Sequence, residues 1–164
     1  MHVEPPAAGE LPAAIVRKIH GSLAAQGLMR HLQARIVRLA PGECEIELPF
    51  SDKVSQQHGY FHGGAIGALA DIAGGYAGYT AIGIDDGILT VEYKLNLMAP
   101  GIGERLIGRG RVLRAGRTLT VTAADIVAVQ AGEEKLVAVM QQTLFTMPGI
   151  EPAQRYAANQ ETAP

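Results

Sequence analysis

Two periodicities of apolar residues divide the chain into helical and strand segments. Over residues 11–26 the apolar positions follow helical spacing, with Pro12 in the first turn and Gly27 where a glycine commonly ends a helix. The repeating apolar residues are Ile15, Ile19 and Leu23. We therefore predict an amphipathic helix over about 11–26 that packs on the domain.

A β-hairpin is predicted next. Residues 31–39 are rich in apolar side chains, and Pro41 followed by Gly42 is a turn signal. In residues 43–48 three glutamates alternate with apolar residues, which is the two-residue period of a half-buried strand. The two runs are joined by a short turn, so they are predicted to pair.

The second half of the chain is predicted to consist of strands. The run 90–97 alternates between apolar odd-numbered and polar even-numbered positions, with Thr90 in the polar set. Three further strands are expected at 104–114, 118–129 and 135–147. Because the connections between successive strands are short, we expect successive strands to pair in antiparallel fashion.

Between the hairpin and these strands, residues 65–83 form a run of small apolar residues with one charge, Asp71. A helix that is apolar on every side has no face suited to water, so the rest of the fold must wrap it. The order of elements suits an antiparallel sheet with helices on one face, and a fully apolar helix requires that sheet to curl. We predict an α+β fold with one curled antiparallel sheet around one long central helix.

One domain, residues 11–148, accounts for all these segments. The flanking stretches 1–10 and 149–164 are rich in Pro, Ala, Glu and Gln and lack apolar periodicity, so we expect mobile tails there. The 164 residues are 48% hydrophobic and 18% charged, which is typical of a globular domain with a sizeable core.

The net charge and the cysteine content narrow the possible binding partners and cellular location. The formal net charge of -2 provides no general attraction to nucleic acid or to anionic membranes. Cys44 is the only cysteine, which excludes an internal disulfide, and the N-terminus lacks the order of a signal peptide, so we expect a cytoplasmic protein. A membrane span over 65–83 is disfavoured by Asp71 near its middle and by its many glycines.

Asp71 is the first candidate for chemistry. An unpaired carboxylate inside an apolar segment costs about several kcal/mol unless another interaction recovers the loss, so we favour a functional role over a surface charge. Just before the helix, Gly59 and the pair Gly63 and Gly64 indicate a tightly turning backbone. Free N–H groups at such a helix start can hold a negatively charged or polarised oxygen.

His58 and His62 raise the alternative of a metal site. Their spacing of four could place two ligands on one face of a helix. They precede the predicted helix, however, and no Glu or Cys completes a recognisable ligand pattern. We expect no metal, and a hydrogen bond from His62 that shapes the turn is as reasonable as a direct chemical role.

These residues together resemble a known signature. Gln56, Gly59, the run from His62 to Gly64, and Asp71 are similar to the motif of hotdog-fold acyl-CoA thioesterases of the phenylacetate-type, PaaI-like branch. The similarity extends over about 42–147 and includes the strand that begins at Leu89. It implies a hotdog fold, hydrolysis of a CoA thioester and no metal or redox cofactor.

The resemblance also implies roles for individual residues. Asp71 would be the catalytic carboxylate, which either attacks the thioester carbonyl or activates water. The backbone N–H of Gly63 would polarise the carbonyl oxygen. Gln56, which stands where many members have Asn, would orient the nucleophile or the water, and Thr90 would assist the same step.

Helix geometry adds a constraint to these roles. Gly63 and Asp71 are eight residues apart, which on one straight helix is about 12 Å of axial rise. A carboxylate must come within about 3 Å of the group it acts on, so Asp71 cannot serve the carbonyl that Gly63 of the same chain polarises. This hypothesis therefore requires a homodimer, or a dimer of dimers, whose subunits share their sites.

Substrate-binding candidates are Gly64, beside the predicted oxyanion donor, and the arginines of 105–117. This segment holds five arginines and no acidic residue. The arginines could form a solvated strand face, or Arg114 and Arg117, which flank a predicted turn, could bind the phosphates of CoA. Nucleic acid is a weaker alternative, since the chain is net acidic and lacks an aromatic stacking platform.

Two other functions remain open from the sequence. A hotdog hydratase or dehydratase would use a His and a carboxylate to move protons on an enoyl-CoA. A non-catalytic protein of the same fold would bind acyl-CoA without hydrolysing it, because fold alone does not decide function.

Overall fold

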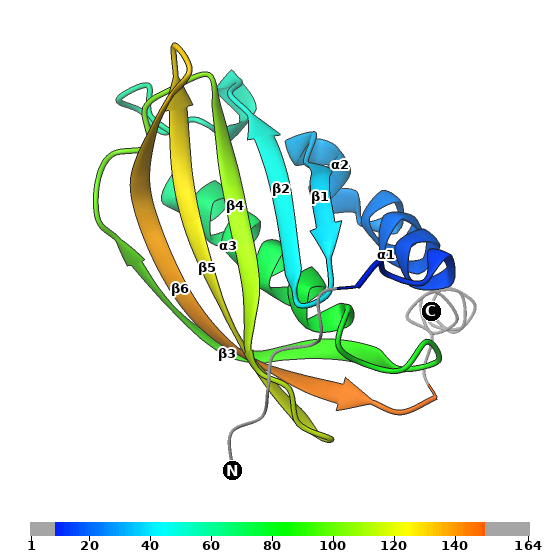
Figure 1. Ribbon diagram of the computed structural model, residues 1–164. Coiled ribbons are helices and arrows are strands. Elements are labelled where there is room, and N and C mark those ends of the chain that lie inside the picture. The colour runs from blue at the N-terminus through cyan, green and yellow to red at the C-terminus, as the bar shows by residue number, and fades with distance from the viewer. Residues whose placement is uncertain (1–8, 150–164) are drawn as a thin grey trace, which may run out of the picture.

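The structure is a computed structural model that describes residues 9–149, and its centre is the helix α3, Gly63–Tyr79. A six-stranded sheet curls around this helix (Figure 1). The strands are β1 Arg35–Ala40, β2 Glu43–Pro49, β3 Gly87–Leu97, β4 Arg105–Arg114, β5 Leu119–Gln130 and β6 Glu133–Met147. This arrangement confirms the predicted α+β hotdog fold.

The strand order is β1-β2-β4-β5-β6-β3, and every neighbouring pair is antiparallel. The prediction that successive strands pair is confirmed for β1 with β2, β4 with β5, and β5 with β6. It is wrong for β3, which pairs with β6 and not with β4. The helix α3 separates β2 from β3 in the sequence, so the chain reaches the opposite edge of the sheet before β4 returns beside β2.

Two helices precede the sheet. The predicted helix over 11–26 is confirmed as α1, Ala13–Ala25, which buries the three apolar residues of its periodic stripe. Gly27 does not end it but begins a second helix, α2, Gly27–Leu32, because Gln26 is extended and breaks the first. Gln33, in the left-handed region with φ 57°, ends α2, so β1 starts later than the predicted strand at 31–39.

The helix α3 lies very close to β4, because Gly108 and Gly110 of that strand leave room for the helix. A Cβ atom added to Gly110 of β4 would lie 2.0 Å from the carbonyl oxygen of Ala73. The helix ends at Tyr79, four residues before the predicted end, where the hydroxyl of Thr80 donates to the carbonyl oxygen of Ala77 at 2.7 Å. Close packing fixes the height and rotation of every side chain on α3.

A β-bulge in β3 changes which residues face this helix. The register with β6 shifts between Thr90 and Glu92, so the strict alternation predicted for 90–97 is wrong. Thr90 faces α3, as do Tyr93 and Leu95 beyond the bulge, which approach Gly67. An extra residue in one strand of a pair flips the side chains that follow it, and bulges are common where a side chain must be aimed at a site.

Within residues 9–149, no helix combines the length and the apolar character needed to cross a bilayer. Most of the predicted tails, 1–10 and 149–164, lies outside the described residues. The short 3₁₀ turn η1, Asp52–Val54, leads from β2 into the segment before α3.

Candidate active site

Asp71 is half-buried in the third turn of α3, in a set of hydrogen bonds. The hydroxyl of Thr90 donates to Asp71 Oδ1 at 2.8 Å, and the side-chain amide of Gln142 donates to the same oxygen. No lysine or arginine among the described residues pairs with this carboxylate. Burial raises the pKa of Asp71, and the Thr90 hydrogen bond acts in the opposite direction. The structure thus brings together two predicted residues, Asp71 and Thr90.

Sequence reasoning missed two residues of this network, Gln142 of β6 and Thr122 of β5. Both are buried, and the hydroxyl of Thr122 donates to Gln142 Oε1 at 3.0 Å. A signal was present, because Gln142 is a large polar residue between two apolar residues, Met140 and Leu144, on the inward face of β6. Buried polar residues are the informative exceptions in a core.

The first turn of α3 presents one unused donor. His62 caps the helix, and its Nδ1 accepts the N–H of Gly64 at 2.8 Å. The N–H groups of Ala65 and Ile66 donate to the carbonyl oxygen of His62 at 2.9 and 3.1 Å. The N–H of Gly63 has no acceptor among the described residues, so it is available to a substrate oxygen.

His62 therefore has the turn-shaping role that the sequence allowed, and its hydrogen bond engages the N–H of Gly64. His58 lies in the preceding turn, so the two histidines do not share a helix face. In the described part of the chain, no three His, Cys, Asp or Glu side chains group as metal ligands would.

Gly63 opens onto a pocket of about 410 Å³ that Gln56 also lines. The side-chain oxygen of Gln56 accepts the N–H of His58, which leaves the amide nitrogen as a donor. The remaining lining residues are Tyr60, Phe61, Ile66, Leu97, Met98, Ala99, Pro100 and Gly101. We call Gln56 and Gly63 the donor half-site, and Asp71 with Thr90 the acid half-site.

One residue of each half-site, Gly63 and Asp71, lies on the helix α3, but the two residues are far apart. Asp71 does not line the pocket of Gly63, and eight residues of α3 separate them by about 12 Å. The side chain of Asp71, which two hydrogen bonds keep in place, is too short to span this distance. Within one chain, Gly63 and Asp71 therefore do not meet.

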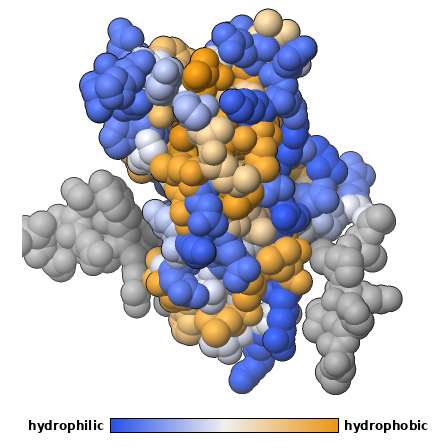
Figure 2. All heavy atoms as spheres, turned by 90° about the vertical axis from the view of Figure 1, so that its left-hand side faces the viewer, coloured by the Kyte–Doolittle hydropathy of each residue, from blue (hydrophilic) through white to orange (hydrophobic). Residues whose placement is uncertain are grey.

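The strand β3 forms an open and apolar edge beside both half-sites. Leu89, Val91 and Leu97 of β3 and Met98, which follows it, are 55, 57, 56 and 58% exposed, although all four are large hydrophobic residues. Figure 2 shows hydrophobic side chains in a band along the β3 side of the molecule, between hydrophilic margins. A long apolar edge strand is usually covered, because its free backbone groups and side chains otherwise promote association.

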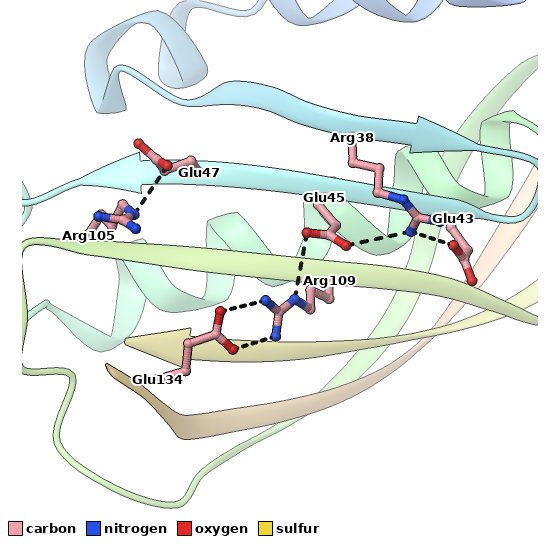
Figure 3. A network of polar contacts seen from close by, with 7 residues as sticks. All are labelled: Arg38, Glu43, Glu45, Glu47, Arg105, Arg109 and Glu134. Carbon is pink, nitrogen blue, oxygen red and sulfur yellow. Dashed lines mark hydrogen bonds and ion pairs between the residues drawn. The ribbon is translucent and has the colours of Figure 1, made fainter. Parts of the chain in front are cut away.

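The arginines of β4 divide into two groups. Arg105 and Arg109 lie in a ladder of ion pairs on the outer face of the sheet, with Glu47, Glu45 and Glu134 as partners (Figure 3). Arg111 pairs with Asp125 at 2.9 Å. For these three residues the solvated strand face is the correct interpretation.

Arg114 and Arg117 form the second group. Both are exposed at the turn between β4 and β5, and neither has an acidic partner among the described residues. They do not line the pocket of Gly63. Their guanidinium groups are therefore free to meet an anion that approaches this end of the sheet.

Comparisons with known proteins connect this geometry to a family. The family model described as Thioesterase superfamily matches residues 58–135, which include Gly63, Asp71 and Thr90. A thioesterase family protein from Silicibacter pomeroyi is 39% identical, with a TM-score of 0.80 over 82% of this chain and 99% of that one. A candidate esterase of Saccharolobus solfataricus is 31% identical over 101 residues, which are 62% of this chain and 71% of the relative.

The fold is also that of the PaaI protein from the phenylacetic acid degradation operon of Escherichia coli. The TM-score is 0.75 over 85% of this chain and 98% of that one, at 20% identity, which supports a likeness of fold. The family match, the Silicibacter relative and the curled sheet around α3 agree with one another. The chain belongs to the thioesterase superfamily, as a member with the hotdog fold.

Proposed function

We propose that the protein hydrolyses acyl-CoA thioesters as a homodimer, in which the donor half-site of one subunit meets the acid half-site of the other. Membership of the family makes the protein a thioester hydrolase. The single observation that carries the rest is the separation of Gly63 from Asp71 along one helix, beside an open apolar edge.

The chemistry follows from the atoms that each half-site offers. The N–H of Gly63, at the positive end of a 17-residue helix, points at the thioester oxygen, which becomes more negative as the carbonyl carbon is attacked. Asp71 of the partner subunit either attacks that carbon or takes a proton from water that attacks it. In either route the carbon–sulfur bond breaks and CoA leaves as the thiolate. Where Asp71 is the nucleophile, water then hydrolyses the acyl–Asp71 anhydride, so both routes give a free acid and CoA.

A two-fold axis beside β3 would complete two sites at once. In such a dimer each contact occurs twice, so if Asp71 of the partner subunit reaches Gly63, the reverse contact also forms. The exposed β3 residues would become buried in the interface, which removes apolar surface from water. Water, a carboxylate and amide donors suffice for this hydrolysis, so the proposal includes no metal or redox cofactor.

The hydratase alternative needs a His beside the carboxylate and the substrate. His62 directly precedes Gly63, but it lines a different pocket, with residues of α2 and η1, and not the pocket of Gln56 and Gly63. Its Nδ1 is also occupied by the N–H of Gly64. We therefore favour thioester hydrolysis.

The test is a substrate panel with aryl, short-chain and long-chain acyl-CoA, each also supplied as the thioester of truncated pantetheine. We expect hydrolysis of at least one acyl-CoA, with a higher KM for the truncated form. Replacing both Arg114 and Arg117 by Ala should remove that KM difference, because these arginines are proposed to bind phosphates of CoA, while the salt-bridged Arg111→Ala serves as control. Hydration of an enoyl-CoA, or tight CoA-thioester binding without release of thiol, would contradict the proposal.

A further inference from the structure

Gln142 of β6 forms hydrogen bonds with both side chains of the acid half-site. Its Nε2 donates to Asp71 Oδ1, to Thr90 Oγ1 at 2.9 Å and to the main-chain oxygen of Asp71 at 3.3 Å. The residue is 1% exposed, so these contacts form away from bulk water. One amide nitrogen thus touches both side chains of the acid half-site.

The orientation of this amide is fixed by its other end. The buried hydroxyl of Thr122 donates to Gln142 Oε1, so the oxygen is turned toward β5 and the nitrogen toward Asp71. Gly74 of α3 makes room for the pair, because a Cβ atom there would lie 2.4 Å from Gln142 Oε1 and 2.9 Å from Thr122 Oγ1. A reversed amide would place its donors against Thr122 and its acceptor against a carboxylate.

We propose that Gln142 is the positioning residue of the reaction: it ties down Asp71 Oδ1 and Thr90, so that Asp71 Oδ2 alone is presented to the partner subunit's substrate. Oδ2 has no hydrogen-bond partner among the described residues. This inference rests on the proposed function, and it adds a residue that acts through Asp71 without touching the substrate.

Two measurable consequences follow. A donor to a carboxylate favours the ionised form, so removing it raises the pKa of Asp71 and moves the acid limb of the kcat profile to higher pH. A carboxylate that is no longer held in one rotamer also spends less time in the reactive geometry, and a misplacement of about 1 Å can cost about 10²-fold in rate. Neither effect requires a change in substrate affinity.

Within one chain, the helix-facing side chains of β3, β5 and β6 near Asp71 include one titratable group. Tyr93 is the titratable residue on the helix side of β3, and it lies one turn away against Gly67. The inward faces of β5 and β6 near Gln142 carry Thr, Ala, Met and Leu. Glu92 is turned to the outside, where it accepts the hydroxyl of Thr143.

The experiment compares Gln142→Met with Gln141→Met. Gln141 is the neighbouring residue on β6 and is exposed on the opposite face, so the same substitution there removes the same amide without touching the site. We expect Gln142→Met to lower kcat by about 10²-fold with KM nearly unchanged and to move the acid limb up by about one pH unit, while Gln141→Met behaves as wild type.

Two further readouts keep the test decisive. The ¹³C titration of the Asp71 carboxyl reports its pKa without any substrate, so it is informative even if no acyl-CoA is hydrolysed and the proposed function fails. If Gln142→Met does not fold, Thr122→Val takes its place, because it preserves the shape of the side chain and removes the hydrogen bond to Gln142 Oε1. We expect Thr122→Val to lower kcat several-fold and to raise the pKa of Asp71. An unchanged pKa of Asp71 together with wild-type kcat in either folded variant would overturn the proposal.

Discussion

Asp71→Asn is expected to abolish thioester hydrolysis, with kcat lower by about 10³-fold or more. The amide has nearly the shape of the carboxylate and retains an oxygen that accepts from Thr90 and Gln142. It can neither attack a carbonyl carbon nor take a proton from water. Steady-state release of free CoA thiol measures the effect, with the best acyl-CoA of the panel as substrate.

The thermal stability of Asp71→Asn is the control that distinguishes a loss of catalysis from a loss of folding. Burial raises the pKa of Asp71 in the folded state, so the folded protein holds that proton more tightly than the unfolded chain does. Stability is then lost as pH rises from the ordinary pKa of Asp through the raised one, and at neutral pH the ionised Asp71 is a cost. We expect a Tm at pH 7 equal to or above that of wild type. Normal turnover by the folded Asp71→Asn variant would contradict a catalytic role for Asp71.

Gly63→Pro is expected to lower kcat by about 10² to 10³-fold, which is the usual effect of removing one oxyanion donor. Proline lacks the backbone N–H, and it is well accommodated at the first position of a helix. His62 already has φ -66° and ψ 138°, the extended conformation that a residue before proline prefers. The substitution therefore deletes one donor and leaves the helix start intact.

Gly63→Ala is the matched control for this prediction. It adds a Cβ in the same place, 3.0 Å from the flexible end of Leu97, but keeps the N–H. We expect Gly63→Ala to retain most of the turnover that Gly63→Pro loses, with circular dichroism unchanged in both. Equal activity of the two variants would show that the Gly63 N–H is not the oxyanion donor.

The sequence could predict the parts of this site that lie close together in the chain. The glycines before α3 and the one charge in an apolar helix are local patterns, and they point to Gly63 and Asp71. If these two residues act on one thioester, as we propose, their spacing along one helix requires a second subunit. The curl of the sheet followed from a helix that has no polar face.

The pairing of strands that are distant in the sequence is harder to predict from local patterns. Local periodicity could not show that β3 pairs with β6, because alternation describes a strand and not its neighbour. The bulge that turns Thr90 toward α3 breaks the alternation, and the residues around it carry no turn signal. Gln142 reaches Asp71 across 71 positions of sequence, so its role depends on the completed sheet.

A hybrid dimer of two inactive variants tests the shared site most directly. Chains with Asp71→Asn and chains with Gly63→Pro, coexpressed with different tags and purified as the hybrid dimer, would have one site with both changes and one site with neither. We predict about half of wild-type turnover per hybrid dimer, because the intact donor half-site of one chain faces the intact acid half-site of the other. A hybrid no more active than the two parent variants would contradict it, since a site built within one chain is damaged in both.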